Sequence, residues 1–228
     1  MTTEILADAE AVAKRAAMYI AEQAQIAVSA RGRFIFAVSG GRTPWVMMRQ
    51  LTREDVPWAD TDIVQVDERI APSGHADRNL TSLVDCLRDA PFRQEQIHAM
   101  PVEDQNLDAA ADRYGRLLQT IAGSPPVLDL IHLGLGPDGH TASLVPGDPV
   151  LDVADRAVAL TNVYQGRRRM TLTFPVLNRA RRILWVVTGS DKAKALAQLR
   201  HGDTTIPAGR IQQDRAQLIA DSAAAEWA

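Results

Sequence analysis

One stretch near the middle of the chain, VLDLIHLGLGPDGHTASLVPG at residues 127–147, constrains the fold more than any other. It opens with an apolar run and then breaks into closely spaced glycines, with Asp138 and His140 inside the break. A short apolar run bounded by turn residues predicts a buried strand of a parallel sheet. Ligands of such sheets bind beyond the carboxyl ends of the strands, so we expect the active site at this break.

Strand and helix patterns alternate along all 228 residues, with no linker or repeat between them. Apolar residues at helical spacing predict helices at 3–29, 44–51, 79–87, 107–121, 175–177 and 193–199. Short apolar runs predict strands at 33–38, 62–66, 127–133, 157–160, 183–188 and 217–220. This order predicts an α/β fold in which residues 1–228 form a single domain. Its core would be one doubly wound, mainly parallel sheet flanked by helices.

Composition and charge argue against several classes of protein. The net charge of −3 provides no general field for nucleic acid or for membranes. The apolar runs are too short to span a membrane, and the acidic N-terminus is unlike a signal peptide. The single cysteine, Cys86, cannot form an intramolecular disulfide and fits a reducing compartment. We therefore expect a cytoplasmic protein without a nucleic-acid or membrane partner.

The strand at 33–38 leads directly into SGGRTP at residues 39–44. A strand, a pair of glycines and a new helix together point backbone N–H groups at an anion. Thr43 is suited to the N-cap of that helix and Pro44 to its first turn. The alternative is a tight turn whose glycines only allow positive φ angles. The segment lacks the GxxxxGK[ST] spacing of a nucleotide P-loop, so we expect it to bind the phosphate of a smaller ligand.

Charged residues follow other strands as well. Asp67, Glu68 and Arg69 follow the strand at 62–66, where they either face a site or form a local ion-pair network. Lys192 follows the strand at 183–188. The arginines at 167–169 either form a solvated strip or contact an anionic ligand. In contrast, His75 and His98 lie in loop-like segments without a partner pattern, and we expect both at the surface.

Several familiar sites fit the sequence poorly. Gly134, Gly136 and Gly139 match the dinucleotide pattern G-x-G-x-x-G, but prolines soon after them stop the crossover helix that such a site needs. Asp138 and His140 are too few for a metal site, and Ser39 lacks the G-x-S-x-G turn of a serine hydrolase. The remaining candidate is His140, whose side chain could act as a general base near neutral pH. The alternative is that His140 only caps its own short helix.

Five segments together resemble the 6-phosphogluconolactonase family. They are SGGRTP at 39–44, VDER at 66–69, LGLGPDGHTASLVPG at 133–147, RRRMTLTFPVLN at 167–178 and TGSDKAKAL at 188–196. They occur in the family's order, and the GxGxDGHTASLxPG segment is the most specific. The SGGxTP segment is shared with glucosamine-6-phosphate deaminases. Arg42 and Asn79 depart from the family pattern, since a small or polar residue is common at the first position and a serine usually precedes the second.

The resemblance implies a modified Rossmann-like fold and hydrolysis of 6-phospho-D-glucono-1,5-lactone in the oxidative pentose phosphate pathway, without a metal or cofactor. It implies His140 as the general base and Asp138 as its partner, with the identity of the base left open between the two. The remaining site residues implied are Ser39, Gly40, Gly41, Arg42, Thr43, Asp67, Arg69, Asn79, Gly136, Gly139, Arg167 and Lys192. Backbone N–H groups at 136–139, or Arg69, would stabilise the oxyanion. Arg168 or Arg169 could replace Arg167 at the phosphate.

Two other functions remain compatible with the sequence. A sugar-phosphate isomerase or deaminase would use the same phosphate-binding segment, but the DGHTASL motif argues against it. A sugar-phosphate sensor that is not an enzyme would need a separate DNA-binding region, for which the N-terminal helix leaves no room. The expected partner is a small-molecule substrate. The sequence is compatible with a monomer and does not determine the oligomeric state.

Overall fold

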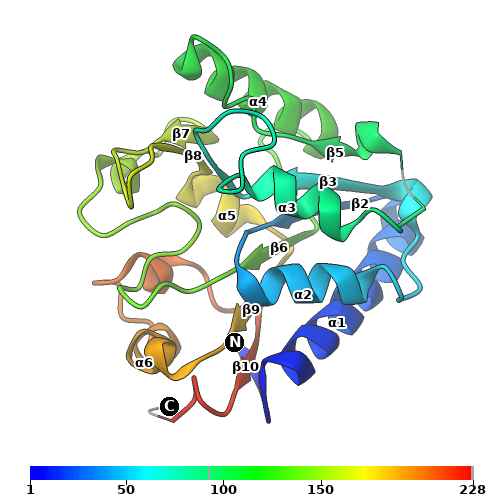
Figure 1. The fold of residues 1–228 in the computed structure, drawn as a ribbon, viewed down its shortest axis with the longest axis vertical. Coiled ribbons are helices and arrows are strands. Elements are labelled where there is room, and N and C mark those ends of the chain that lie inside the picture. The colour runs from blue at the N-terminus through cyan, green and yellow to red at the C-terminus, as the bar shows by residue number, and fades with distance from the viewer. Residues whose placement is uncertain (92, 227–228) are drawn as a thin grey trace.

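A computed structural model describes residues 1–91 and 93–226, and within them a seven-stranded parallel sheet forms the centre of the molecule (Figure 1). Its strand order is β1-β10-β9-β6-β2-β3-β5, and every neighbouring pair is parallel. The strands are β1 (Thr2–Leu6), β2 (Phe34–Val38), β3 (Thr61–Gln65), β5 (Ile97–His98), β6 (Leu130–Leu133), β9 (Arg182–Val187) and β10 (Ala216–Asp221). The predicted mainly parallel sheet is confirmed.

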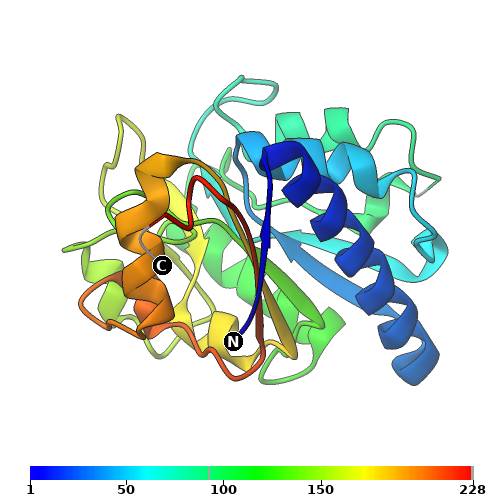
Figure 2. The same ribbon diagram turned by 90° about the horizontal axis from the view of Figure 1, so that it is seen from below.

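Helices cover both faces of this sheet, as the doubly wound fold predicts. One face carries α1 (Ala9–Arg31), α2 (Arg42–Leu51) and α3 (Asn79–Cys86). The other carries α4 (Leu107–Ala122), α5 (Phe174–Arg179) and α6 (Ala193–Arg200). Figure 2 shows α1 and α6 on opposite sides of the sheet. Short 3₁₀ helices lie in the connections at Trp58–Asp60, Gln94–Gln96, Pro149–Asp152, Ser190–Lys192 and Pro207–Arg210.

The two faces of β2 show why short apolar runs form this sheet. Phe34, Phe36 and Val38 pack with α1, α2 and α3, whereas Ile35 and Ala37 pack with the core on the other face. All five side chains are buried, because side chains alternate between the two faces of a strand and both faces are covered. A continuous apolar run is therefore the pattern that this position requires.

The sheet reverses its direction of growth between β2 and β6. From β2 the chain proceeds outward through β3 to β5, and then returns to the other side of β2 to add β6, β9 and β10 in turn. The loops after β2 and β6 therefore leave the sheet in opposite directions, which opens a crevice at the carboxyl ends of the strands. The two most informative sequence segments, 39–44 and 134–147, both begin at this edge.

A second, antiparallel sheet lies beside the main one and was not predicted. It contains β4 (Asp67–Arg69), β8 (Arg169–Leu172) and β7 (Val158–Leu160), in the order β4-β8-β7. Asp67 pairs with Thr171 and Arg69 with Arg169 in the β4–β8 ladder. The charged segment after β3 is thus a strand whose partners come from a region about 100 residues later in the chain.

Three local predictions are wrong. The first predicted helix does not start near residue 3, because Thr2–Leu6 forms β1 and the Asp8 side chain caps α1 by accepting a hydrogen bond from Ala11 N. Thr43 is not an N-cap, since α2 begins at Arg42 and Gly41 occupies that position. His98 lies on β5, where its Nε2 is 2.8 Å from Asp62 Oδ1.

In the described part of the chain, no helix combines the length and the apolar character that crossing a membrane would require.

Candidate active site

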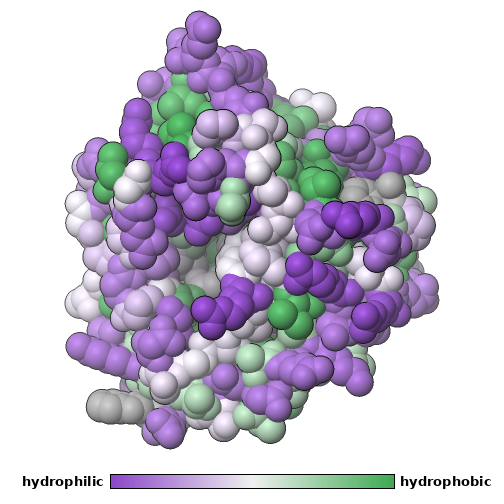
Figure 3. All heavy atoms as spheres, viewed as in Figure 1, coloured by the Kyte–Doolittle hydropathy of each residue, from purple (hydrophilic) through white to green (hydrophobic). Residues whose placement is uncertain are grey.

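A pocket of about 400 Å³ lies at the edge where the sequence places the active site. The loops after β2, β6 and β9 line it, together with the β4 strand that follows β3. In Figure 3 this face of the molecule is hollowed near its centre, and strongly hydrophilic side chains border the pale hollow. The lining residues are Ser39, Gly40, Gly41, Arg42, Thr43, Pro44, Asp67, Arg69, Asn79, Gly134, Leu135, His140, Ala142, Arg169, Val186, Val187, Thr188, Asp191 and Lys192.

The loop between β2 and α2 forms one wall of the pocket. Gly41 has a φ of 138°, a conformation that favours glycine, and α2 starts at the next residue. A Cβ on Gly40 would lie 2.0 Å from Asn79 Oδ1, so only glycine fits beside that amide. Among the described residues, none accepts a hydrogen bond from the N–H groups of Gly40 and Gly41. Two unpaired N–H groups at the start of a helix favour an anion.

The loops after β2 and β9 are tied together at this wall. The hydroxyls of Thr43 and Thr188 lie 2.7 Å apart and share a hydrogen bond. Lys192 follows on the same side, with its Nζ 3.0 Å from Asp191 Oδ2. The exposed Arg42 side chain adds a second cation to this wall.

The loop after β6 holds Asp138 and His140 in contact. His140 Nδ1 lies 2.5 Å from Asp138 Oδ1, and His140 lines the pocket whereas Asp138 does not. The close packing of this pair depends on Gly136, where a Cβ would lie 2.0 Å from His140 Nδ1 and 2.6 Å from Asp138 Oδ1. Burial pulls the pKa of Asp138 upward, but the hydrogen bond and charge of His140 outweigh it, and the pKa lies below its ordinary value.

Two of the predicted glycines shape this loop without lining the pocket. Gly136 N–H donates to His140 O, and Gly139 N–H donates to Gly136 O. Gly139 also has a φ of 80°, and a Cβ there would lie 2.5 Å from Ile206. The N–H groups of both glycines are therefore occupied by the loop itself.

Asp67, Arg69 and Asn79 line the opposite wall. Asp67 Oδ2 accepts a 2.6 Å hydrogen bond from Ser143 Oγ, which ties β4 to the loop after β6. Asn79 is held within this wall, since its Nδ2 donates to Asp67 O and its Oδ1 accepts from Arg69 Nη1. The same Oδ1 that accepts from Arg69 also lies next to Gly40, so Asn79 links this wall to the β2–α2 loop.

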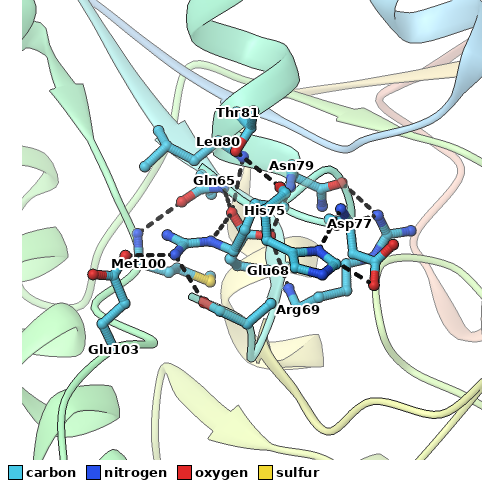
Figure 4. Close-up of polar contacts among 12 residues, drawn as sticks. Gln65, Glu68, Arg69, His75, Asp77, Asn79, Leu80, Thr81, Met100 and Glu103 are labelled. Atoms are coloured by element: carbon cyan, nitrogen blue, oxygen red, sulfur yellow. Dashed lines mark hydrogen bonds and ion pairs between the residues drawn. The ribbon is translucent and has the colours of Figure 1, made fainter. Parts of the chain in front are cut away.

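A buried carboxylate supports this wall from behind. Glu68 Oε1 accepts from the N–H groups of Arg69 and Asn79, and its Oε2 accepts from Leu80 N and from Gln65 Nε2. Its Oε2 also lies 3.2 Å from Arg78 Nε, and both side chains are buried. Figure 4 shows these contacts converging on Glu68. Of the alternatives for the segment at 67–69, Asp67 and Arg69 face the pocket while Glu68 belongs to an ion-pair network.

The three adjacent arginines have different positions. Arg169 lines the pocket and is buried, and this burial lowers the pKa of its guanidinium. Arg167 lies outside the pocket lining and pairs with Asp77, with its Nη2 2.9 Å from Asp77 Oδ2. Arg168 Nε donates to Thr161 O. The sequence left the choice among these arginines open, and the structure places Arg169 rather than Arg167 at the pocket.

Tyr164 and Ser143 contact the predicted residues but were not predicted themselves. Tyr164 OH donates a 3.1 Å hydrogen bond to Asp138 Oδ2, although the two lie 26 residues apart. No sequence motif marks this tyrosine, because its role depends on a hairpin that the sequence did not predict. Ser143 lies inside the DGHTAS motif, so its position near the site could have been noticed.

Several buried donors at the pocket lack a protein partner. Ser39 Oγ, Arg69 Nε and Arg169 Nε have none among the described residues, and all three residues line the pocket. Buried polar atoms are rarely left unpaired, so donors gathered in this way favour an anionic ligand. Among the described residues, no group of three or more His, Cys, Asp or Glu side chains could hold a metal ion.

Comparison with known proteins shows the family of this chain. The family model for glucosamine-6-phosphate isomerases/6-phosphogluconolactonase matches residues 7–220. The chain belongs to this family. Among curated members, a 6-phosphogluconolactonase from Nostoc sp. is 36% identical over 203 residues, which cover 87% of this chain and 84% of that protein. The human 6-phosphogluconolactonase is 34% identical, and the match covers 95% of this chain and 86% of that protein.

Solved structures of the family share the fold. A 6-phosphogluconolactonase from Thermotoga maritima has a TM-score of 0.85 at 23% identity, over 96% of this chain and 98% of that one. A monomeric glucosamine-6-phosphate deaminase has a TM-score of 0.86 at 18% identity, over the full length of both chains. Identities this low show the common fold and do not separate the two reactions.

Proposed function

We propose that this protein hydrolyses 6-phospho-D-glucono-1,5-lactone to 6-phospho-D-gluconate, the lactonase step of the oxidative pentose phosphate pathway. The observation that carries the proposal is the position of His140, which faces a cation-lined pocket while Asp138 holds its other side. The curated 6-phosphogluconolactonases that match most of the chain support the same reaction.

In this mechanism His140 is the general base and Asp138 its partner. Asp138 accepts the Nδ1 proton of the imidazole, which leaves Nε2 with a lone pair for the attacking water. Water adds to the lactone carbonyl as its proton passes to Nε2. When the tetrahedral intermediate collapses, the bond from C1 to the ring oxygen breaks, and the imidazolium returns the proton to that oxygen. The Asp138 carboxylate stabilises the imidazolium between these steps.

Arginines supply the oxyanion donors in this proposal. Gly136 and Gly139 use their N–H groups inside the loop, so these amides are poor candidates. Arg69 and Arg169 line the pocket, and each has a buried Nε without a protein partner. Charged donors in a partly dehydrated pocket stabilise a developing oxyanion strongly.

The substrate phosphate would bind at the wall formed by the β2–α2 loop. Ser39, Gly40, Gly41 and Thr43 would provide hydroxyls and N–H groups, and Arg42 and Lys192 the opposing charge. Because this wall and His140 belong to neighbouring loops, one sugar phosphate can reach both. The phosphate contacts would orient the lactone, which is how binding energy from an unreactive group assists catalysis.

The test is to incubate the purified protein separately with the phosphorylated lactone, unphosphorylated gluconolactone and glucosamine 6-phosphate. Formation of 6-phosphogluconate is followed with its dehydrogenase, and spontaneous ring opening is subtracted. We expect turnover of the phosphorylated lactone above the spontaneous rate, weaker turnover without the phosphate, and no release of ammonia. Deamination of glucosamine 6-phosphate without lactone hydrolysis would replace this proposal with the other reaction of the family.

A further inference from the structure

The hairpin between β7 and β8 brings a tyrosine beside the Asp138–His140 pair. Tyr164 N–H donates to Arg167 O across a two-residue turn. The turn residues Gln165 and Gly166 have φ angles of 51° and 78°, the signature of a type I′ hairpin turn. This turn type matches the twist of the flanking strands, so Tyr164 projects from a well-defined backbone position.

Tyr164 contacts the oxygen of Asp138 that His140 leaves free. Its hydroxyl donates to Asp138 Oδ2, whereas His140 Nδ1 contacts Oδ1. The tyrosine and imidazole rings meet edge to face, with centroids 5.4 Å apart. A carboxylate held through both oxygens has little freedom to rotate, and it fixes the plane of the imidazole that it contacts.

The same tyrosine ring supports a cation of the pocket. The guanidinium of Arg169 lies over the Tyr164 ring at 4.9 Å from its centroid. Arg169 also donates to Gln165 Oε1 at 3.2 Å and to Ser143 Oγ at 3.5 Å. Tyr164 itself is not part of the pocket lining. It can therefore influence the pocket only through the residues that it holds.

We propose that Tyr164 is a positioning residue that aligns Asp138 for His140 through its hydroxyl and holds Arg169 at the pocket through its ring. This inference rests on the proposed lactone hydrolysis, with His140 as base and Arg169 as a donor to the substrate. The two halves of the side chain have separate roles, and two substitutions separate them. Tyr164→Phe removes the hydroxyl and keeps the ring, whereas Tyr164→Leu removes both.

The hydroxyl has a further effect on the pH dependence. The titratable groups facing Asp138 are His140 from its own loop and Tyr164 from the hairpin, and Arg169 faces the tyrosine ring. Burial raises the pKa of Asp138, while the hydrogen bonds from His140 and Tyr164 lower it. Removing the hydroxyl raises that pKa, so the ionised carboxylate is lost at a higher pH as the solution is acidified. The titration of the Asp138 carboxyl, followed by carbon NMR, must then shift to higher pH.

The experiment compares wild type, Tyr164→Phe, Tyr164→Leu and the control Val163→Ala, which changes a neighbouring side chain that is 67% exposed. For Tyr164→Phe we expect kcat to fall about five- to tenfold with KM nearly unchanged, the effect of losing one ordinary, partly exposed hydrogen bond. For Tyr164→Leu we expect an additional rise in KM of about threefold, because Arg169 loses its aromatic support. Val163→Ala is expected to match wild type.

A wild-type kcat and an unshifted Asp138 titration in Tyr164→Phe would overturn the inference while the lactonase activity stands. If wild type shows no lactonase activity, the proposed function fails, and carbon NMR of the Asp138 carboxyl decides this inference separately. A higher carboxyl pKa in Tyr164→Phe than in wild type is the expected result. Identical titration curves would overturn the role of the hydroxyl.

Discussion

Gly136 allows a direct test of how closely catalysis depends on the position of His140. A Cβ at this residue would lie 2.0 Å from His140 Nδ1 and 2.2 Å from its Cε1, whereas ordinary contacts begin at 3.4 Å. The imidazole in Gly136→Ala must therefore move by about 1.4 Å at Nδ1. A shift of that size breaks the 2.5 Å contact with Asp138 and moves the base away from the attacking water.

Misplacing a catalytic group by about 1 Å can cost about 10²-fold in rate, so we expect kcat of Gly136→Ala to fall by at least that factor. The fold should be retained, since Gly136 does not have a positive φ and the clash involves two partly exposed side chains. The assay is lactone hydrolysis coupled to 6-phosphogluconate oxidation, with thermal unfolding measured in parallel.

Gly115→Ala is the matched control. It adds the same methyl group within α4, where the nearest atom would be at 3.7 Å, and helix propensity favours alanine there by about 1 kcal/mol. We expect wild-type kinetics and equal or higher stability from this control. A Gly136→Ala enzyme with kcat within about twofold of wild type would refute the argument that this glycine makes room for the base.

Three further predictions concern the support of the pocket. Gly40→Ala should raise KM about tenfold with a smaller change in kcat, because its Cβ would meet Asn79 Oδ1 at 2.0 Å and distort the β2–α2 loop. Product inhibition by 6-phosphogluconate should weaken in parallel. Glu68→Gln leaves buried Arg78 with only the half-exposed Glu103 as a carboxylate partner and should lower the free energy of unfolding by about 2 kcal/mol in urea titrations. An unchanged midpoint would contradict the role of the network. Burial lowers the pKa of His132 to about 3 in the folded protein, below its value of about 6.5 in the unfolded chain. Between these two pH values the unfolded chain binds more protons than the folded protein, so the free energy of unfolding falls as the pH drops through that range. His132→Leu should make unfolding free energy less dependent on pH there, and an identical slope would show that His132 does not contribute.

Much of the main sheet could be predicted because its signals are local. The strands at β2, β6 and β9 are short apolar runs, and each is followed by glycines or polar residues that end it. Because all these strands are parallel, the residues after them must gather at one edge of the sheet. This rule is sufficient to predict from the sequence that Gly40, His140 and Lys192 lie at the same edge.

The remainder depends on contacts between distant residues. Thr2–Leu6 has three polar residues followed by two apolar ones, so it shows no strand-like alternation. The five residues run into a helical pattern and pair only with β10, more than 200 residues later. The β4-β8-β7 sheet likewise joins residues about 100 positions apart. Without that sheet, the sequence could not show that Arg169 faces the pocket or that Tyr164 reaches Asp138. These are tertiary contacts with no local signal.

The most direct test of the account compares lactone hydrolysis by wild type and His140→Ala, with circular dichroism to confirm that both are folded. We expect wild type to exceed spontaneous ring opening and His140→Ala to lose about 10²- to 10⁴-fold of that enzymatic rate, the usual contribution of a general base. If a folded His140→Ala enzyme retains the wild-type rate, His140 is not the base and the mechanism proposed from this pocket is wrong.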